Sequence, residues 1–129
     1  MEKKVIHTNN APAAIGPYSQ GIECGGFIFT AGQIPIDPDT TKLIDGNFQS
    51  QVRRVLENIK GILSEGGSDL SRVVKMTVFV TDLNNFSQLN AVFSEFFGNT
   101  NPPARSAVEV SALPLGSEVE IECIAAVDE

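Results

Sequence analysis

Two charged residues in the C-terminal part of the sequence offer the clearest chemistry. Arg105 follows Pro102-Pro103-Ala104, and because proline restricts the backbone, the arginine enters its strand from a stiffened segment. A guanidinium binds a carboxylate through two parallel hydrogen bonds. Glu120 lies on the polar face of the next predicted strand, and a positioned carboxylate orients or activates water. Together the two residues indicate chemistry on a small carboxylic acid.

Each of these residues also has a plainer interpretation. Arg105 could be a solvated or ion-paired arginine, since most exposed arginines are structural. Glu120 could be a solvated carboxylate that keeps an edge strand from pairing. Strand alternation places it on one face with Glu118 and Glu122. These three carboxylates would repel one another unless they diverge or a cation such as Lys75 or Arg105 is near.

Two further residues are candidates for the wall of a small site. Tyr18 is the only tyrosine and ends the loop Ile15-Gly16-Pro17-Tyr18, where it is either a site residue with a polar tip or a packed loop anchor. Asn90 lies in an amphipathic helical segment, and its amide either binds a local backbone group or reaches a ligand. Residue types and spacing leave both alternatives open.

The composition excludes several classes of function. The sequence has 9 Lys and Arg against 16 Asp and Glu, a net charge of −7 that disfavours nucleic acids and acidic membranes. It contains no metal-ligand spacing, phosphate loop or Ser/His/Asp set, and one histidine cannot build a histidine metal site. We therefore expect no metal and no cofactor. With no leader or long apolar run, and with Cys24 and Cys123 read as free thiols, a cytoplasmic protein is expected.

The length of 129 residues predicts a single domain, 1–129, in which six strands position these residues. Gly25-Gly26 is a two-residue hairpin signal between two of the strands. Alternating and apolar runs predict strands at 3–7, 21–24, 27–31, 73–80, 105–110 and 118–127.

Two helices are predicted from apolar residues spaced three and four apart. The first begins after an N-cap at Asn47 and stops at Gly66-Gly67, and its buried stripe comprises Phe48, Val52, Val55, Leu56, Ile59, Ile62 and Leu63. The second begins at Asn84 or Asn85 and ends at Gly98, and its buried stripe comprises Phe86, Leu89, Phe93, Phe96 and Phe97.

This order of elements, β-β-β-α-β-α-β-β, predicts an α+β fold with a mixed six-stranded sheet and both helices on one face. In the strand 73–80, alternation directs Val74 toward the helices and leaves Val73, Thr77 and Phe79 on the open face. A half-apolar sheet face in so small a domain favours packing against another subunit.

Taken together, the motifs of the chain resemble the reactive intermediate deaminase family, also called the Rid or YjgF type, nearly from end to end. The matching segments are Asn10–Gly21, Gly32-Gln33-Ile34-Pro35, Val73–Val80, Asp82-Leu83, Asn90, Phe96-Phe97, Pro103-Ala104-Arg105-Ser106 and Ile121-Glu122. This resemblance implies a chorismate-mutase-like fold and a homotrimer with ligand clefts between subunits. It also implies hydrolysis of 2-imino acids, formed when pyridoxal-phosphate dehydratases act on serine or threonine, to 2-oxo acids and ammonia.

The resemblance further implies roles for individual residues. Arg105 would hold the substrate carboxylate and Glu120 would position the hydrolytic water. Tyr18 and Asn90 would line the cleft, and Gly32 would bring its backbone close to the ligand.

Two positions depart from the family pattern. Many members have Ser where this chain has Ala31, and Cys where it has Ala107. Backbone contacts could survive at Ala31, and the change at Ala107 argues against a cysteine nucleophile there.

Three functions remain in competition. The first is deamination of 2-iminobutanoate and 2-iminopropanoate. The second is an endoribonuclease or translation inhibitor, which the acidic charge disfavours. The third is a non-catalytic trimer that binds small 2-oxo acids or acts as a holdase. Retention of Glu120 favours the first over the third, because a carboxylate binder needs only Arg105.

Overall fold

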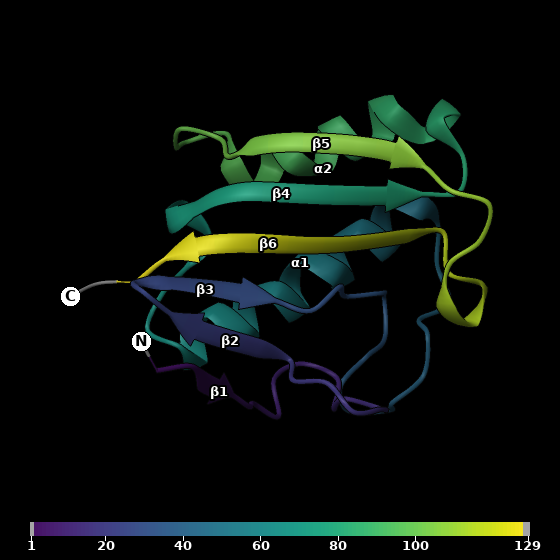
Figure 1. Ribbon diagram of the computed structural model, residues 1–129. Helices are drawn as coiled ribbons and strands as arrows, with labels where there is room; N and C mark the ends of the chain where they lie inside the picture. The colour runs from purple at the N-terminus through teal and green to yellow at the C-terminus, as the bar shows by residue number, and fades with distance from the viewer. Residues whose placement is uncertain (1, 128–129) are drawn as a thin grey trace.

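The computed structural model describes residues 2–127, which form one twisted sheet backed by two helices (Figure 1). The strand order is β1-β2-β3-β6-β4-β5. β4 and β5 pair in parallel, and the other neighbouring strands pair antiparallel. The strands are β1 (Lys4–Ile6), β2 (Gly21–Cys24), β3 (Phe27–Thr30), β4 (Val73–Val80), β5 (Ala104–Glu109) and β6 (Val119–Ala126). The prediction of a mixed six-stranded α+β fold is confirmed.

Both helices lie on the same face of the sheet, as predicted, and Figure 1 shows them behind it. The side chain of Asn47 caps α1 (Phe48–Glu65) by accepting a hydrogen bond from the Ser50 amide at 2.9 Å. α2 (Phe86–Phe97) follows a short 3-10 turn, Leu83–Asn85, which Asp82 caps by accepting a hydrogen bond from the Asn84 amide. Neither helix within the described residues is long and apolar enough to cross a membrane.

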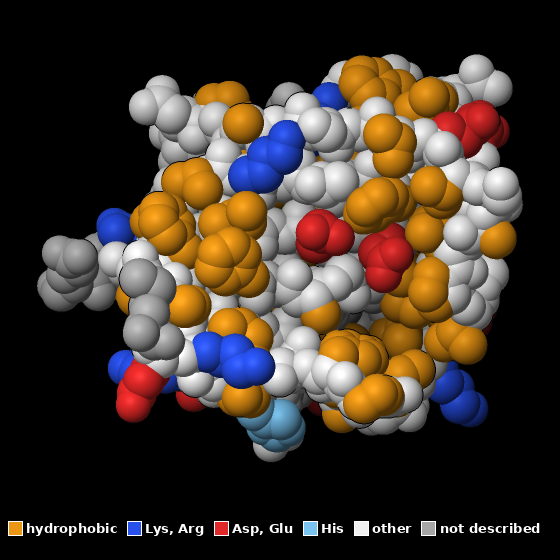
Figure 2. All heavy atoms as spheres, in the orientation of Figure 1, with side chains coloured by type: hydrophobic (Ala, Val, Ile, Leu, Met, Phe, Trp, Pro, Cys, Tyr) orange, Lys and Arg blue, Asp and Glu red, His pale blue; other side chains and the backbone are white. Residues whose placement is uncertain are grey.

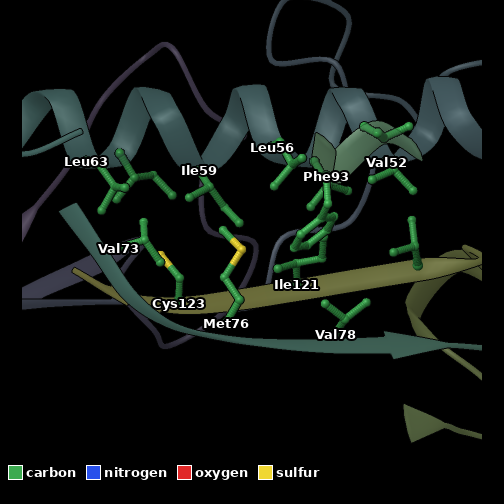
Figure 3. Close-up of a cluster of buried hydrophobic side chains, with 14 of the residues drawn as sticks. Val52, Leu56, Ile59, Leu63, Val73, Met76, Val78, Phe93, Ile121 and Cys123 are labelled. Carbon is green, nitrogen blue, oxygen red and sulfur yellow. The ribbon is translucent and has the colours of Figure 1, made fainter. Parts of the chain in front are cut away.

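The hydrophobic core fills the space between the helices and the sheet (Figure 3). The predicted stripe of α1 is wholly buried, and the buried side chains of β4 and β6 that face it alternate with side chains that are mostly half-buried. Figure 3 shows Val52, Leu56, Ile59 and Leu63 of α1 directed toward Met76 and Val78 of β4 and Ile121 and Cys123 of β6.

A β-bulge overturns one prediction for β4. The pairing of β4 with β6 shifts register between Val73 and Lys75. The extra residue rotates the start of the strand, so that Val73 is buried and Val74 is 46% exposed. Strict alternation predicts the reverse, with Val74 facing the helices and Val73 on the open face.

Helix α2 also differs from its predicted stripe. Leu89, Phe93 and Phe97 are buried, but Phe96 is only half-buried and Phe86 is 40% exposed. Phe86 therefore lies outside the core, because it begins the helix at its solvent-exposed end.

Among residues 2–127, no helix lies over the other face of the sheet. One cross-strand row on this face joins Val5, Ile22, Phe29 and Ile124, and a second joins Phe79 to Val108. Phe27, Phe29 and Val108 each remain more than 40% exposed. Figure 2, which looks onto this face, shows hydrophobic side chains gathered over it and acidic side chains near its centre.

Candidate functional site

Glu120 lies on the open face, opposite Phe79 in the pairing of β4 and β6. After β3 the chain continues beside β6, because the backbones of Gln33 and Ile121 exchange hydrogen bonds of 2.8 and 3.1 Å. This path brings Gly32 against the carboxylate, and a Cβ atom at position 32 would lie 2.5 Å from Glu120 Oε2. A side chain at position 32 would therefore displace the carboxylate.

A cavity of about 80 Å³ opens beside Glu120. Its other lining residues are Pro12, Ala13, Ile15, Tyr18, Gly32, Gln33, Ile34, Ile36 and Pro114. This mostly apolar surrounding disfavours the charged carboxylate. Burial, and secondly the charge of Glu122, raises the pKa of Glu120. A carboxylate with a raised pKa is a stronger proton acceptor, as general-base chemistry requires.

A buried amide fixes the loop that carries Tyr18. Nε2 of Gln20 donates to the carbonyls of Thr8, Ala11 and Pro12 at 3.0, 3.2 and 2.8 Å. Its Oε1 accepts from the Thr8 amide at 2.8 Å. The loop is thus held from inside by one side chain that the sequence analysis did not single out. A lone glutamine in a loop gives no periodic signal that would have revealed it.

Arg105 lies on the other side of the sheet. It pairs with Met76 of β4, whose side chain is fully buried toward the helices. Its guanidinium carbon lies 5.2 Å from the centre of the Phe86 ring and 4.9 Å from that of Phe93. Burial lowers the pKa of Arg105, although arginine stays charged at neutral pH. Within residues 2–127 the guanidinium has no hydrogen-bond or ion-pair partner, so its donors are available to a ligand.

A groove of about 350 Å³ adjoins this guanidinium. It is lined by Asn90, Phe93, Ser94, Phe97, Gly98, Thr100, Pro102, Pro103 and Arg105. The structure thus brings Asn90 together with Arg105, and Tyr18 and Gly32 together with Glu120.

The two groups are separated by the sheet itself. β4 lies between β5 and β6, Arg105 faces the helix layer, and Glu120 faces away from it. A single chain therefore keeps Arg105, with its groove, and Glu120, with its cavity, on opposite faces of the sheet.

Of the two ways in which the three glutamates could avoid repulsion, a nearby cation or divergence, the structure favours divergence. Arg105 cannot serve, because it lies beyond the sheet, and the nearer cation, Lys75, donates to Ser106 Oγ at 2.9 Å. Glu118 precedes β6 and accepts from Gln51 of α1 at 2.7 Å, so it does not share the open face with Glu120 and Glu122.

The two departures from the family pattern lie beside these groups. The Ala31 amide donates to the carbonyl of Gln20 at 2.8 Å, which ties the Gly32 segment to the loop of Tyr18. Ala107 is half-buried against the core on the same strand as Arg105. Across residues 2–127, neither alanine lines either cavity, and no cluster of three or more His, Cys, Asp or Glu could hold a metal ion.

The fold and these residues define a member of a known family. The family model described as Endoribonuclease L-PSP matches residues 8–127, and the chain belongs to this family, which includes the reactive intermediate deaminases.

Named relatives agree with this assignment. The chain is 55% identical to a RutC family protein of Pyrococcus abyssi over 97% of this chain and 98% of that protein. It is 48% identical to the 2-iminobutanoate/2-iminopropanoate deaminase of Salmonella typhimurium, over 95% of this chain and 96% of the relative. Among solved structures, Escherichia coli TdcF with bound serine superposes with a TM-score of 0.92 at 44% identity, covering 97% of this chain and 99% of TdcF.

Proposed function

We propose that this protein hydrolyses reactive 2-imino acids, 2-iminobutanoate and 2-iminopropanoate among them, to 2-oxo acids and ammonia. The observation that carries the proposal is the raised pKa of Glu120 at the edge of a small apolar cavity. A relative named for this reaction, 48% identical, supports it, as does the bound serine of TdcF, which is a small amino acid with a carboxylate.

In the proposed reaction, the guanidinium of Arg105 holds the substrate carboxylate through two charge-assisted hydrogen bonds. Glu120 accepts a proton from a water molecule while the water oxygen bonds to the C=N carbon and the π electron pair moves to nitrogen. Glu120 returns its proton to that nitrogen, the carbinol hydroxyl gives up its own proton to the nitrogen as the C=O bond forms, and the C–N bond breaks to release ammonia. The steps consume one water and need no oxidant or reductant.

The separation of the two halves has a direct consequence for assembly. Arg105 and Glu120 face opposite sides of the sheet, so one substrate can reach both only if they come from different copies of the chain. We therefore propose a homotrimer with three intersubunit sites, in which the apolar open face is covered by neighbouring copies. Asn90 would line each site with Arg105, and Tyr18 and the backbone of Gly32 would line it with Glu120.

The substrates would be supplied by pyridoxal-phosphate dehydratases, and we place the reaction in the cytoplasm with them. Ala31 and Ala107 line neither cavity of the single chain, and in the assembled site they would offer only backbone and methyl groups, so no thiol takes part at position 107.

RNA cleavage, which the name of the family model suggests, is not favoured by this chain. Its net charge is −7, and its one histidine, His7, lies just after β1, outside both cavities. Ribonuclease chemistry would need a phosphate-binding surface and an acid–base pair directed at the ribose.

The test is to generate 2-iminobutanoate with a threonine dehydratase and to follow 2-oxobutanoate release with and without this protein. The parent is expected to accelerate release, and Glu120→Gln is expected to lose that acceleration by roughly 10²–10⁴-fold while it still binds 2-oxobutanoate. If 2-oxobutanoate is released at the same rate with and without the parent, the protein is not this hydrolase; if the parent and Glu120→Gln accelerate release equally, Glu120 is not the base.

A further inference from the structure

Two aromatic rings of α2 flank the guanidinium of Arg105. The ring centres of Phe86 and Phe93 lie 5.2 and 4.9 Å from its central carbon, both within the range of cation–π attraction. The two phenylalanines are seven residues apart, which is close to two helical turns, so they share one face of α2. Asn90 lies between them on that face, four residues after the first and three before the second.

The two rings differ in their surroundings. Phe93 is 8% exposed and belongs to the core, whereas Phe86 is 40% exposed. A phenylalanine that remains so exposed contributes little to core packing. Its most specific contact within the described residues is the one with Arg105, which suggests a role in placing that side chain.

The start of α2 is itself tied to the strand of Arg105. Glu109 of β5 accepts a hydrogen bond from the Leu83 amide at 2.9 Å, in the turn just before Phe86. Asp82 caps the same turn by accepting from the Asn84 amide at 2.9 Å. These contacts fix where the Phe86 ring lies relative to Arg105.

Contacts with aromatic rings leave the N–H donors of a guanidinium available for hydrogen bonds. Within residues 2–127, the Arg105 guanidinium donates to no oxygen, so the two phenylalanines restrict its position and leave its donors free. An arginine held in this way loses less side-chain entropy when it binds a carboxylate.

We propose that Phe86, together with Phe93, is a positioning residue that holds the Arg105 guanidinium ready for a carboxylate ligand. The inference rests on the proposed function for the identity of that ligand, an imino or oxo acid. Because Phe86 acts through Arg105 and lies on the other side of the sheet from Glu120, it affects carboxylate affinity and not proton transfer.

The experiment compares Phe86→Leu, Phe86→Tyr and the control Phe96→Leu. Phe96 lies on the same helix and is half-buried, but neither cation–π contact of Arg105 involves it. Calorimetry with 2-oxobutanoate gives affinity, and turnover of 2-iminobutanoate gives kcat and KM separately. Phe86→Leu is expected to weaken binding and raise KM by roughly two- to fivefold with kcat little changed. Phe86→Tyr, which keeps the ring, and Phe96→Leu should both resemble the parent.

Other results overturn the proposal. Unchanged affinity in Phe86→Leu, an equal loss in Phe86→Tyr, or an equal loss in Phe96→Leu would each show that the ring does not position Arg105. If Phe86→Leu does not fold, NMR of the parent provides the test. The two rings must shift the Arg105 side-chain resonances from their random-coil positions, and unshifted resonances would overturn the proposal. If 2-oxobutanoate binding follows the expected pattern but no imine is hydrolysed, the positioning role stands and the proposed hydrolase function fails.

Discussion

At the scale of single residues, Arg105 is expected to be the anchor for the substrate carboxylate. Its guanidinium is half-buried, charged and without a hydrogen-bond partner in residues 2–127, so a bound anion would gain its full fork of donors. Arg105→Ala is expected to cost on the order of 2–5 kcal/mol in kcat/KM, because the ligand carboxylate is left unpaired. Arg105→Lys should recover only part of this, because an ammonium cannot form the bidentate pair. Activity of Arg105→Ala equal to that of the parent would remove the residue from the site.

The pH dependence of the reaction is expected to report on Glu120. Burial and the charge of Glu122 raise its pKa, and only the ionised carboxylate accepts a proton. Activity should therefore fall as the pH drops through this raised pKa. Removing one cause, in Glu122→Gln, lowers the Glu120 pKa and should move the acid limb of kcat/KM to lower pH. An acid limb that stays in place, measured in the same buffers, would show that another group titrates.

At the scale of elements, the segment after β3 determines how Glu120 is aimed. Gly32→Ala would place a Cβ 2.5 Å from Oε2, and the flexible glutamate would swing aside. We expect turnover to fall on the order of 10²-fold, as for a misplacement of about 1 Å, with little change in Tm.

The matched control is Gly26→Ala, at the tip of the hairpin between β2 and β3. Gly26 has a φ of 85° and no atom near its Cβ position, so alanine there should lower Tm through backbone strain and leave turnover intact. If Gly32→Ala instead behaves like this control, position 32 matters only for folding.

Most elements could be predicted because their signals are local. Asn47 caps α1 as its sequence indicates, and the Gly25-Gly26 hairpin has the two positive φ values, 62° and 85°, that such a turn requires. Val73 and Val74 could not be assigned, because a β-bulge depends on how two distant strands pair and not on alternation within one strand.

The two halves of the candidate site could be predicted only in part. Arg105 and Glu120 could be selected by type and motif, but their placement on opposite sheet faces depends on the strand order. Strand order is set by long-range pairing, and no local pattern in the sequence encodes it. The same holds for Phe86, which has the spacing of a core residue but lies at an exposed helix end.

At the scale of the whole molecule, the division of the site predicts complementation between inactive variants. Arg105→Ala and Glu120→Gln should each be inactive alone. Unfolded, mixed in equal amounts and refolded, they should regain about a quarter of the parent activity, because about one interface in four joins an intact Arg105 to an intact Glu120. Sedimentation should give about three times the 13.8 kDa chain mass.

Two results would contradict this assembly. A monomer at micromolar concentration would leave the open face uncovered and the site divided. A trimer whose mixed variants stay inactive would show that no intersubunit site joins Arg105 of one copy to Glu120 of another.

The position of β6 at the centre of the sheet has a consequence for biosynthesis. β6 emerges from the ribosome after both helices and all five other strands, yet it joins β3 to β4. Until it arrives, the nascent chain carries two partial sheets with unpaired inner edges, and such edges bind other chains. A ribosome-bound chain stalled after Ser117 should therefore be cleaved rapidly by protease and held by chaperones. The same chain extended through Val127 on a linker should resist cleavage, and equal resistance of the two would mean that the sheet closes without its central strand.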